Sequence, residues 1–197
     1  MEKVHINGEI RQVSGKSING GLRREGKLPA VIYGRNDNIL FSTSAKAVKD
    51  IVYTPDFKLA EIDIDGATHL CILKDIQFHP VSEEIVHIDF LKLYDSVPVK
   101  LEVPIRFKGS SPGVKLGGKL IQQLRKVKIK TTPEHMVDTM YADISELGLG
   151  QAIRVKDLIS NENIEIMNNP AVPIATIEIP RALKSAAAAE AKASKGK

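Results

Sequence analysis

The dipeptide Asp65-Gly66 constrains the fold of this chain more than any other short segment. It separates two apolar runs, LAEIDI at 59–64 and THLCIL at 68–73. An Asp-Gly pair accepts the positive φ angles of a type I′ turn, which joins two antiparallel strands tightly. The segment therefore predicts a β-hairpin.

Similar short runs, each bounded by turn residues, recur along the chain. Alternation or apolar clustering predicts further strands at 4–10, 29–34, 39–41, 75–78, 84–93, 97–109, 127–130, 136–144 and 171–179. Helix signals are fewer: a segment from Ser44 to Tyr53, a short turn at 22–25 and a short helix around Asp157-Leu158. The pattern is typical of a mainly β protein.

The chain divides by composition into three parts. A β-rich domain is expected at 1–94 and a second β-rich domain at 95–181. The tail at 182–197 is a low-complexity Ala/Lys segment with a single large apolar residue, Leu183. Such a segment cannot bury enough surface to offset its ordering entropy, so we expect it to be disordered.

The composition also excludes some classes of protein. Cys71 is the only cysteine, so no internal disulfide can form, which suits a reducing cytoplasm. The first residues, MEKVHINGEI, lack the apolar core of a secretory signal. No run approaches 18 consecutive apolar residues, so we expect no membrane partner.

Charge is distributed in blocks of opposite sign. Residues 106–130 hold eight Lys/Arg and no acid, whereas 37–105 hold six Lys/Arg against twelve acids. Residues 11–35 hold six basic residues against one acid, Glu25. Four glycines interrupt this segment before Lys27, at positions 15, 20, 21 and 26. A cationic loop leading into a buried strand can hold guanidinium groups against a phosphate backbone. The alternative is a solvated surface loop.

Two other motifs point to an enzyme. The run Gly113 to Lys119 satisfies the G-x-x-x-x-G-K part of a phosphate-binding loop, but Leu120 stands where Ser or Thr would ligate magnesium. His87 and Asp89 share one face of a predicted strand, as two metal ligands would, but no Cys or His at ligand spacing accompanies them. The alternative for this pair is hydrogen bonding to RNA, and His79 before Pro80 could instead cap a turn.

Three sequence segments resemble one family. They are GKLPAVIYG at 26–34, QFHP at 77–80 and HIDF at 87–90, and GVKLGGKL and NPAVPIATIEIP in the second half are similar too. The family is the bacterial large-subunit ribosomal protein that binds 5S rRNA, in its long, two-domain form, also called general stress protein CTC. The resemblance implies a six-stranded β-barrel as the RNA-binding domain, a mostly β second domain, no enzymatic activity and no cofactor.

The resemblance also implies a set of RNA-binding residues. The implied contacts to 5S rRNA come from Arg11, Lys16, Arg23, Tyr33, Gln77, His87 and Asp89, with Ser17 and Arg24 as further candidates. Asn19-Gly20-Gly21 departs from the family, which commonly has basic or hydroxyl residues there, and Arg24 and Lys27 are the candidates to compensate. Residues 95–181 are expected to meet 23S rRNA or a neighbouring ribosomal protein.

The resulting hypothesis is a cytoplasmic, ribosome-associated structural protein that binds 5S rRNA through a basic loop and a His/Asp-bearing strand, with no DNA partner. Two alternatives remain open. One is a stress-related module that binds protein, and the other is a metal-dependent enzyme built on His87, Asp89 and the glycine loop.

Overall fold

The computed structural model describes residues 1–11, 15–35, 38–159 and 163–180, so the predicted disordered tail lies outside the described residues. The chain forms two compact units. The first comprises residues 1–101 and 131–138, and the second comprises 102–130 and the residues from Thr139 on. The domain boundaries expected from the sequence, at 94/95 and 181/182, remain predictions.

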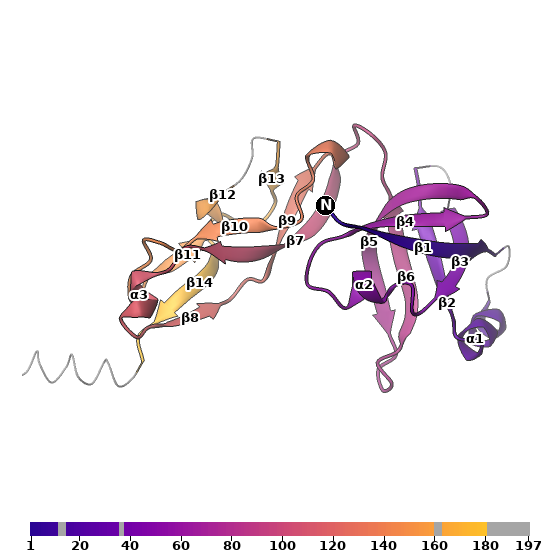
Figure 1. The fold of residues 1–197 in the computed structure, drawn as a ribbon, viewed down its shortest axis with the longest axis horizontal. Coiled ribbons are helices and arrows are strands. Elements are labelled where there is room, and N and C mark those ends of the chain that lie inside the picture. Colours follow the sequence, from indigo (N-terminus) through magenta and orange to yellow (C-terminus); the bar gives the residue numbers. More distant parts are fainter. Residues whose placement is uncertain (12–14, 36–37, 160–162, 181–197) are drawn as a thin grey trace, which may run out of the picture. The chain divides into compact units, whose positions relative to one another are not determined.

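The first unit is a closed six-stranded barrel (Figure 1), which confirms the predicted fold. Its strands are β1 (Lys3–Ile10), β2 (Lys27–Tyr33), β3 (Asn38–Ser44), β4 (Leu59–Ile64), β5 (Ala67–Phe78) and β6 (Ile85–Lys92). Their order around the barrel is β1-β3-β2-β6-β5-β4. The pairs β1–β4 and β2–β6 are parallel, and the others are antiparallel.

The hairpin predicted at Asp65-Gly66 is confirmed. Ile64 pairs with Ala67, which leaves a two-residue turn between β4 and β5. Asp65 and Gly66 have φ angles of 52° and 84°, as the type I′ turn requires.

Alternate residues of each strand fill the barrel. Ile6, Phe41, Ile62, Ile88 and Phe90 are completely buried. The rings of Phe41 and Phe90 lie 6.1 Å apart, within the range of favourable aromatic pairs. The interior is otherwise aliphatic, in keeping with a chain that contains no tryptophan.

The predicted helices of the first unit were wrong in extent. Helix α1 (Lys16–Arg24) lies within the basic segment 11–35, in which only a short turn at 22–25 was expected to be helical. The helix expected from Ser44 to Tyr53 is reduced to α2 (Lys49–Val52), because Ser44 is the last residue of β3. The hydroxyl of Ser44 still accepts a hydrogen bond from the amide of Ala47 in the turn that follows.

The second unit is built from two sheets. The first has the order β12-β10-β7-β9-β13 and the second the order β11-β14-β8. The strands are β7 (Val99–Lys108), β8 (Lys119–Gln122), β9 (Lys126–Thr131), β10 (Met140–Asp143), β11 (Ala152–Arg154), β12 (Leu158–Ile159), β13 (Glu165–Ile166) and β14 (Pro173–Glu178). Between them lie helix α3 (Pro112–Lys115) and the 3₁₀ turns at Pro133–His135 and Val155–Asp157.

The glycines of the run from Gly113 to Lys119 serve backbone packing. A Cβ on Gly113 would lie 2.7 Å from the carbonyl carbon of Gly148, and one on Gly118 would lie 2.6 Å from the carbonyl oxygen of Gly113. Gly117 has a φ of 89°, which other residues rarely adopt. Tight contact between the α3 turn and the backbone near Gly148 therefore explains these glycines by packing.

Candidate nucleic-acid interface

Strand β6 presents His87 and Asp89 on the outside of the barrel. Ile88 and Phe90, which alternate with them along the strand, are completely buried in the core. Side chains alternate across a strand, so His87 and Asp89 lie together on the outer face, as predicted. About a fifth of each side chain is exposed.

Asp89 links His87 to Tyr33. The Nδ1 atom of His87 lies 2.6 Å from Oδ1 of Asp89, and the hydroxyl of Tyr33 donates a 3.3 Å hydrogen bond to Oδ2. Neither Nδ1 nor Oδ1 forms a hydrogen bond among the described residues, the 2.6 Å contact included. We therefore describe His87 and Asp89 as a close electrostatic contact, which is an ion pair whenever the imidazole is protonated.

This environment also affects Tyr33. Partial burial and the charge of Asp89 raise the pKa of the phenol above its ordinary value. The hydroxyl therefore stays protonated, and able to donate to Asp89, throughout the neutral range.

A bulge in β5 brings Gln77 to the same face. Cys71 points into the core, and strict alternation would turn Gln77 inward as well. The pairing with β6 shifts between Leu73 and Asp75, which changes the phase of the strand. Gln77 is consequently exposed and pairs with His87. Two separate strands were predicted here, and the structure has one bulged strand.

Helix α1 is attached to this part of the barrel at both ends. Near its start, Nη1 of Arg11 donates a 2.6 Å hydrogen bond to the side-chain oxygen of Asn19. At its other end, Nε of Arg23 donates to the carbonyl oxygen of Val86 on β6, at 3.2 Å. The helix also packs against β2, the strand that carries Tyr33.

Arg11 has an unusual environment for a cation. Partial burial and the nearby charge of Arg23 both lower the pKa of its guanidinium, burial having the larger effect. Its Nε atom is buried and has no hydrogen-bond partner among the described residues. Glu9, near the end of β1 and two residues before Arg11, forms its ion pair with Lys27 at 2.5 Å.

The remaining predicted residues, Lys16, Ser17 and Arg24, lie on exposed positions of α1. Within the described parts of the chain, no hydrogen bond or ion pair connects them to the strand residues. The structure thus joins Tyr33, Gln77, His87 and Asp89 through β2, β5 and β6, and adds Arg11 and Arg23 through α1.

Sequence reasoning missed the structural part played by Asn19. It treated Asn19 only as a departure from the family pattern, whereas its side chain ties Arg11 to α1. The alternative interpretation of His79 holds: its Nδ1 accepts hydrogen bonds from the amides of Val81 and Ser82 at 3.4 and 3.2 Å and so caps the β5–β6 turn.

Two other kinds of site are absent from the described residues. They contain no group of three or more His, Cys, Asp or Glu side chains placed to hold a metal ion. No helix among them has the length and apolar character needed to cross a bilayer.

Comparison with known proteins identifies the family. Residues 6–90 match the Ribosomal L25p family, and residues 98–181 match the C-terminal domain of ribosomal protein TL5. Large ribosomal subunit protein bL25 of Amoebophilus asiaticus is 40% identical over 196 residues, covering 99% of this chain and all of the relative. The bL25 proteins of Cytophaga hutchinsonii and Bacteroides thetaiotaomicron are 37% and 34% identical, each covering 98% of this chain and all of the relative. The chain therefore belongs to the bL25 family of bacterial large-subunit ribosomal proteins, in the long form that carries a TL5-type C-terminal domain.

Proposed function

We propose that this protein is a structural constituent of the large ribosomal subunit that binds 5S rRNA through the outer face of its barrel. Its membership of a family of structural ribosomal proteins supports the first part and makes it a non-enzymatic protein. The proposed RNA-binding surface, called the barrel face below, comprises Arg11, Lys16, Ser17, Arg23, Arg24, Tyr33, Gln77, His87 and Asp89. Ribosome association in the bacterial cytoplasm follows from the same proposal.

The observation that carries the RNA-binding proposal is the environment of Arg11. Its partly buried guanidinium lies near a second cation, Arg23, and keeps one N–H group without a partner. Such an arrangement is unfavourable unless an anion completes it. A phosphate would neutralise both charges and accept the free N–H of Arg11 in a charge-assisted hydrogen bond.

Helix α1 supplies further phosphate contacts. Lys16 and Ser17 lie in its first turn, and no side chain among the described residues caps that end. The first N–H groups of a helix and its positive dipole end both favour an anion. Arg24 at the opposite end adds a second exposed guanidinium, so α1 can follow a phosphate backbone along its length.

Asp89, His87, Tyr33 and Gln77 form a polar group that suits the edges of an RNA minor groove. The A-form minor groove is wide and shallow and displays 2′-hydroxyls and base edges. Nε2 of His87 can accept a hydrogen bond from a 2′-hydroxyl or an amino group when the imidazole is neutral with its proton on Nδ1, and it can donate one when the ring is charged. Asp89 accepts a hydrogen bond from Tyr33 and lies in close contact with His87, so we assign it a positioning role as well as a direct one.

Titration of the full chain with isolated 5S rRNA tests the proposal. We expect Arg11→Ala and Asp89→Ala each to weaken binding by about 1–3 kcal/mol without unfolding the barrel. With four to six phosphates contacted, log affinity should fall with log salt at a slope of about −3 to −5. Lys58→Ala provides a control, because this lysine is not part of the barrel face; it lies before β4 and pairs with Glu2 at 3.1 Å. Its side chain is only 10% exposed, so thermal melting must show that the variant is folded.

The two classes of variant should differ in salt dependence. Arg11→Ala should reduce the slope by about one, because it removes a phosphate contact, whereas Asp89→Ala should leave the slope nearly unchanged. Binding curves that match the unmodified protein for both variants would refute the barrel face as the binding site. Equal weakening by Lys58→Ala would show that only total charge matters.

A further inference from the structure

The larger sheet of the second unit has one buried face and one exposed face. On β9, Val127 and Ile129 are completely buried, while Lys126 and Lys128 between them are exposed. On β10, Met140 and Ala142 are buried, while Tyr141 is 47% exposed. The same alternation holds on β7, so the outward residues of three neighbouring strands form one continuous face.

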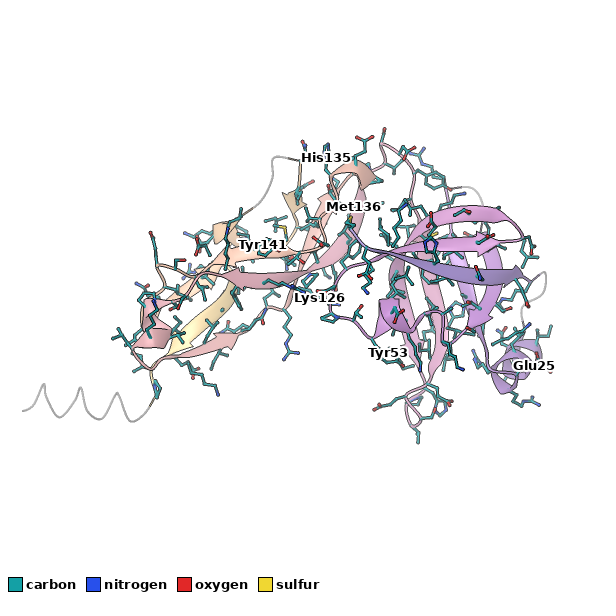
Figure 2. All side chains as sticks on the ribbon, viewed as in Figure 1. Glu25, Tyr53, Lys126, His135, Met136 and Tyr141 are labelled. Atoms are coloured by element: carbon teal, nitrogen blue, oxygen red, sulfur yellow. The ribbon has the colours of Figure 1, made fainter. Side chains whose placement is uncertain are left out.

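Pairing between strands places these residues side by side. Tyr141 pairs with Arg106 of β7 on one side and with Ile159 of β12 on the other. Two contacts show that β9 runs antiparallel to β7. The amide of Ile105 donates to the carbonyl of Arg125, and Lys128, further along β9, contacts Glu102, which comes earlier in β7. Figure 2 shows the positions of Tyr141 and Lys126 on this sheet.

Cations outnumber carboxylates on the exposed face. The cations are Arg106, Lys108, Lys126, Lys128 and Lys130, and the carboxylates are Glu102, Asp143 and Glu165. Two of the lysines form surface ion pairs, Lys128 with Glu102 at 3.6 Å and Lys130 with Glu165 at 2.9 Å. Exposed pairs of this kind stabilise a protein only weakly, so a phosphate can readily replace either carboxylate.

The face also carries exposed apolar side chains beside its cations. Ile159 is 55% exposed next to Tyr141. Tyr141 lies beside Arg106, and the lysines of β9 lie on the other side of β7. The face therefore provides the two components of single-stranded RNA binding: an aromatic ring for base stacking and cations for the backbone. A protein partner would be expected to need a larger apolar centre with charge confined to the rim.

We propose that this sheet face, formed by Tyr141, Arg106, Lys108, Lys126 and Lys128, is a second RNA-binding surface that takes a single-stranded or irregular RNA segment without reading its sequence. Tyr141 stacks on a base, and the lysines contact the flanking phosphates. The inference rests on the second unit alone and does not require the barrel to bind 5S rRNA.

Fluorescence anisotropy of the full chain with a 15-nucleotide mixed-sequence single-stranded RNA, unrelated to 5S rRNA, tests this proposal. To weaken binding by the barrel face, all variants and the parent to which they are compared carry Arg11→Ala and Arg23→Ala. Adding Lys126→Gln and Lys128→Gln should weaken binding about tenfold and reduce the salt slope by about 1.4, since each phosphate contact with a single strand contributes about 0.7. Tyr141→Ala should weaken binding about fivefold or more with the slope unchanged.

Two matched controls sharpen the result. Tyr141→Phe keeps the ring and should stay within about twofold of the parent. Lys115→Gln with Lys119→Gln removes the same charge from α3 and β8, outside the larger sheet, and should also change affinity less than twofold. Thermal melting confirms that each variant is folded.

Three outcomes would overturn the proposal. The first is unchanged binding by the Lys126/Lys128 and Tyr141→Ala variants, and the second is an equal loss in the Lys115/Lys119 control. The third is unchanged RNA binding combined with lost co-sedimentation with large subunits, which would assign the face to a protein partner. Failure of the barrel proposal would appear separately, as an unaltered 5S rRNA titration for Arg11→Ala.

Discussion

The hydroxyl of Tyr33 on β2 donates a hydrogen bond to Oδ2 of Asp89 on β6, across two parallel strands that are 56 residues apart in the chain. The other carboxylate oxygen of Asp89 contacts His87 at 2.6 Å. One carboxylate therefore fixes an aromatic side chain and an imidazole on the outer face of a rigid barrel. Such preorganisation lowers the entropy lost when a partner binds.

A double-mutant cycle on Tyr33→Phe and Asp89→Asn measures this relationship. Because both groups reach solvent, we expect Tyr33→Phe alone to cost less than about 1 kcal/mol of unfolding free energy. If the pair acts as a unit on RNA, the two changes should be non-additive in 5S rRNA affinity by about 0.5–1.5 kcal/mol. Strict additivity in the titrations would show that Tyr33 and Asp89 act independently.

Local sequence pattern was enough for the parts of the site that depend on strand alternation. The outward placement of His87 and Asp89 follows from the buried Ile88 and Phe90, and the turn at Asp65-Gly66 follows from backbone preference. The six-stranded barrel and the site residues came instead from the resemblance to a family. Alternation alone does not specify which strands pair or that the sheet closes.

Two features could not be predicted because tertiary contacts override local preference. Gly20-Gly21 disfavours a helix by about 1 kcal/mol per glycine, yet α1 runs through both because Arg11 and Arg23 attach it to the barrel. The phase change in β5, which turns Gln77 outward, comes from pairing with β6. The sequence marked the position, since separate strands were predicted on either side of Lys74, but it did not show that one continuous strand changes phase there.

The glycines of α1 provide a test of helix stability. A Cβ on Gly21 would have nothing within 4 Å among the described residues. Gly21→Ala should therefore stabilise the protein by up to about 1 kcal/mol, through the higher helix propensity of alanine. Urea denaturation measures the change. A loss of stability would mean that α1 is not a regular helix at Gly21.

Gly8 of β1 makes the opposite case. A Cβ there would lie 2.5 Å from Cδ2 of Phe41, which is completely buried in the barrel core. Gly8→Ala should destabilise the barrel by about 1–3 kcal/mol, because an aromatic ring in a filled core has little room to move. The same denaturation experiment serves as the measurement, and stability equal to the unmodified protein would show that the core relaxes freely.

The near-match to a nucleotide-binding loop leads to a prediction about Gly113. Its missing Cβ allows close contact with the backbone of Gly148, so Gly113→Ala should destabilise the second unit by about 1–3 kcal/mol. Since the loop is explained by packing, isothermal titration with ATP and magnesium should give no binding heat in the unmodified protein. Stoichiometric ATP binding that Gly113→Ala abolishes would restore the nucleotide interpretation.

The buried thiol of Cys71 predicts how stability changes at alkaline pH. Burial in the barrel raises its pKa from 9.0 to about 12, despite the opposing charge of Lys92. Below pH 9 the thiol is protonated in both the folded and unfolded states, so it contributes no pH dependence. Between pH 9 and 12 only the unfolded chain loses this proton, and stability should fall by up to about 1.4 kcal/mol per pH unit from this group.

Because tyrosines and lysines titrate in the same range, the contribution of Cys71 is isolated by comparison with Cys71→Ala. The difference in unfolding free energy between the two proteins should shrink as pH rises above 9 and stay constant below it. The native thiol should also resist a disulfide-exchange reagent at pH 8 and react only as fast as the barrel opens. Rapid stoichiometric labelling of the folded protein at pH 8 would contradict both the burial of Cys71 and the raised pKa.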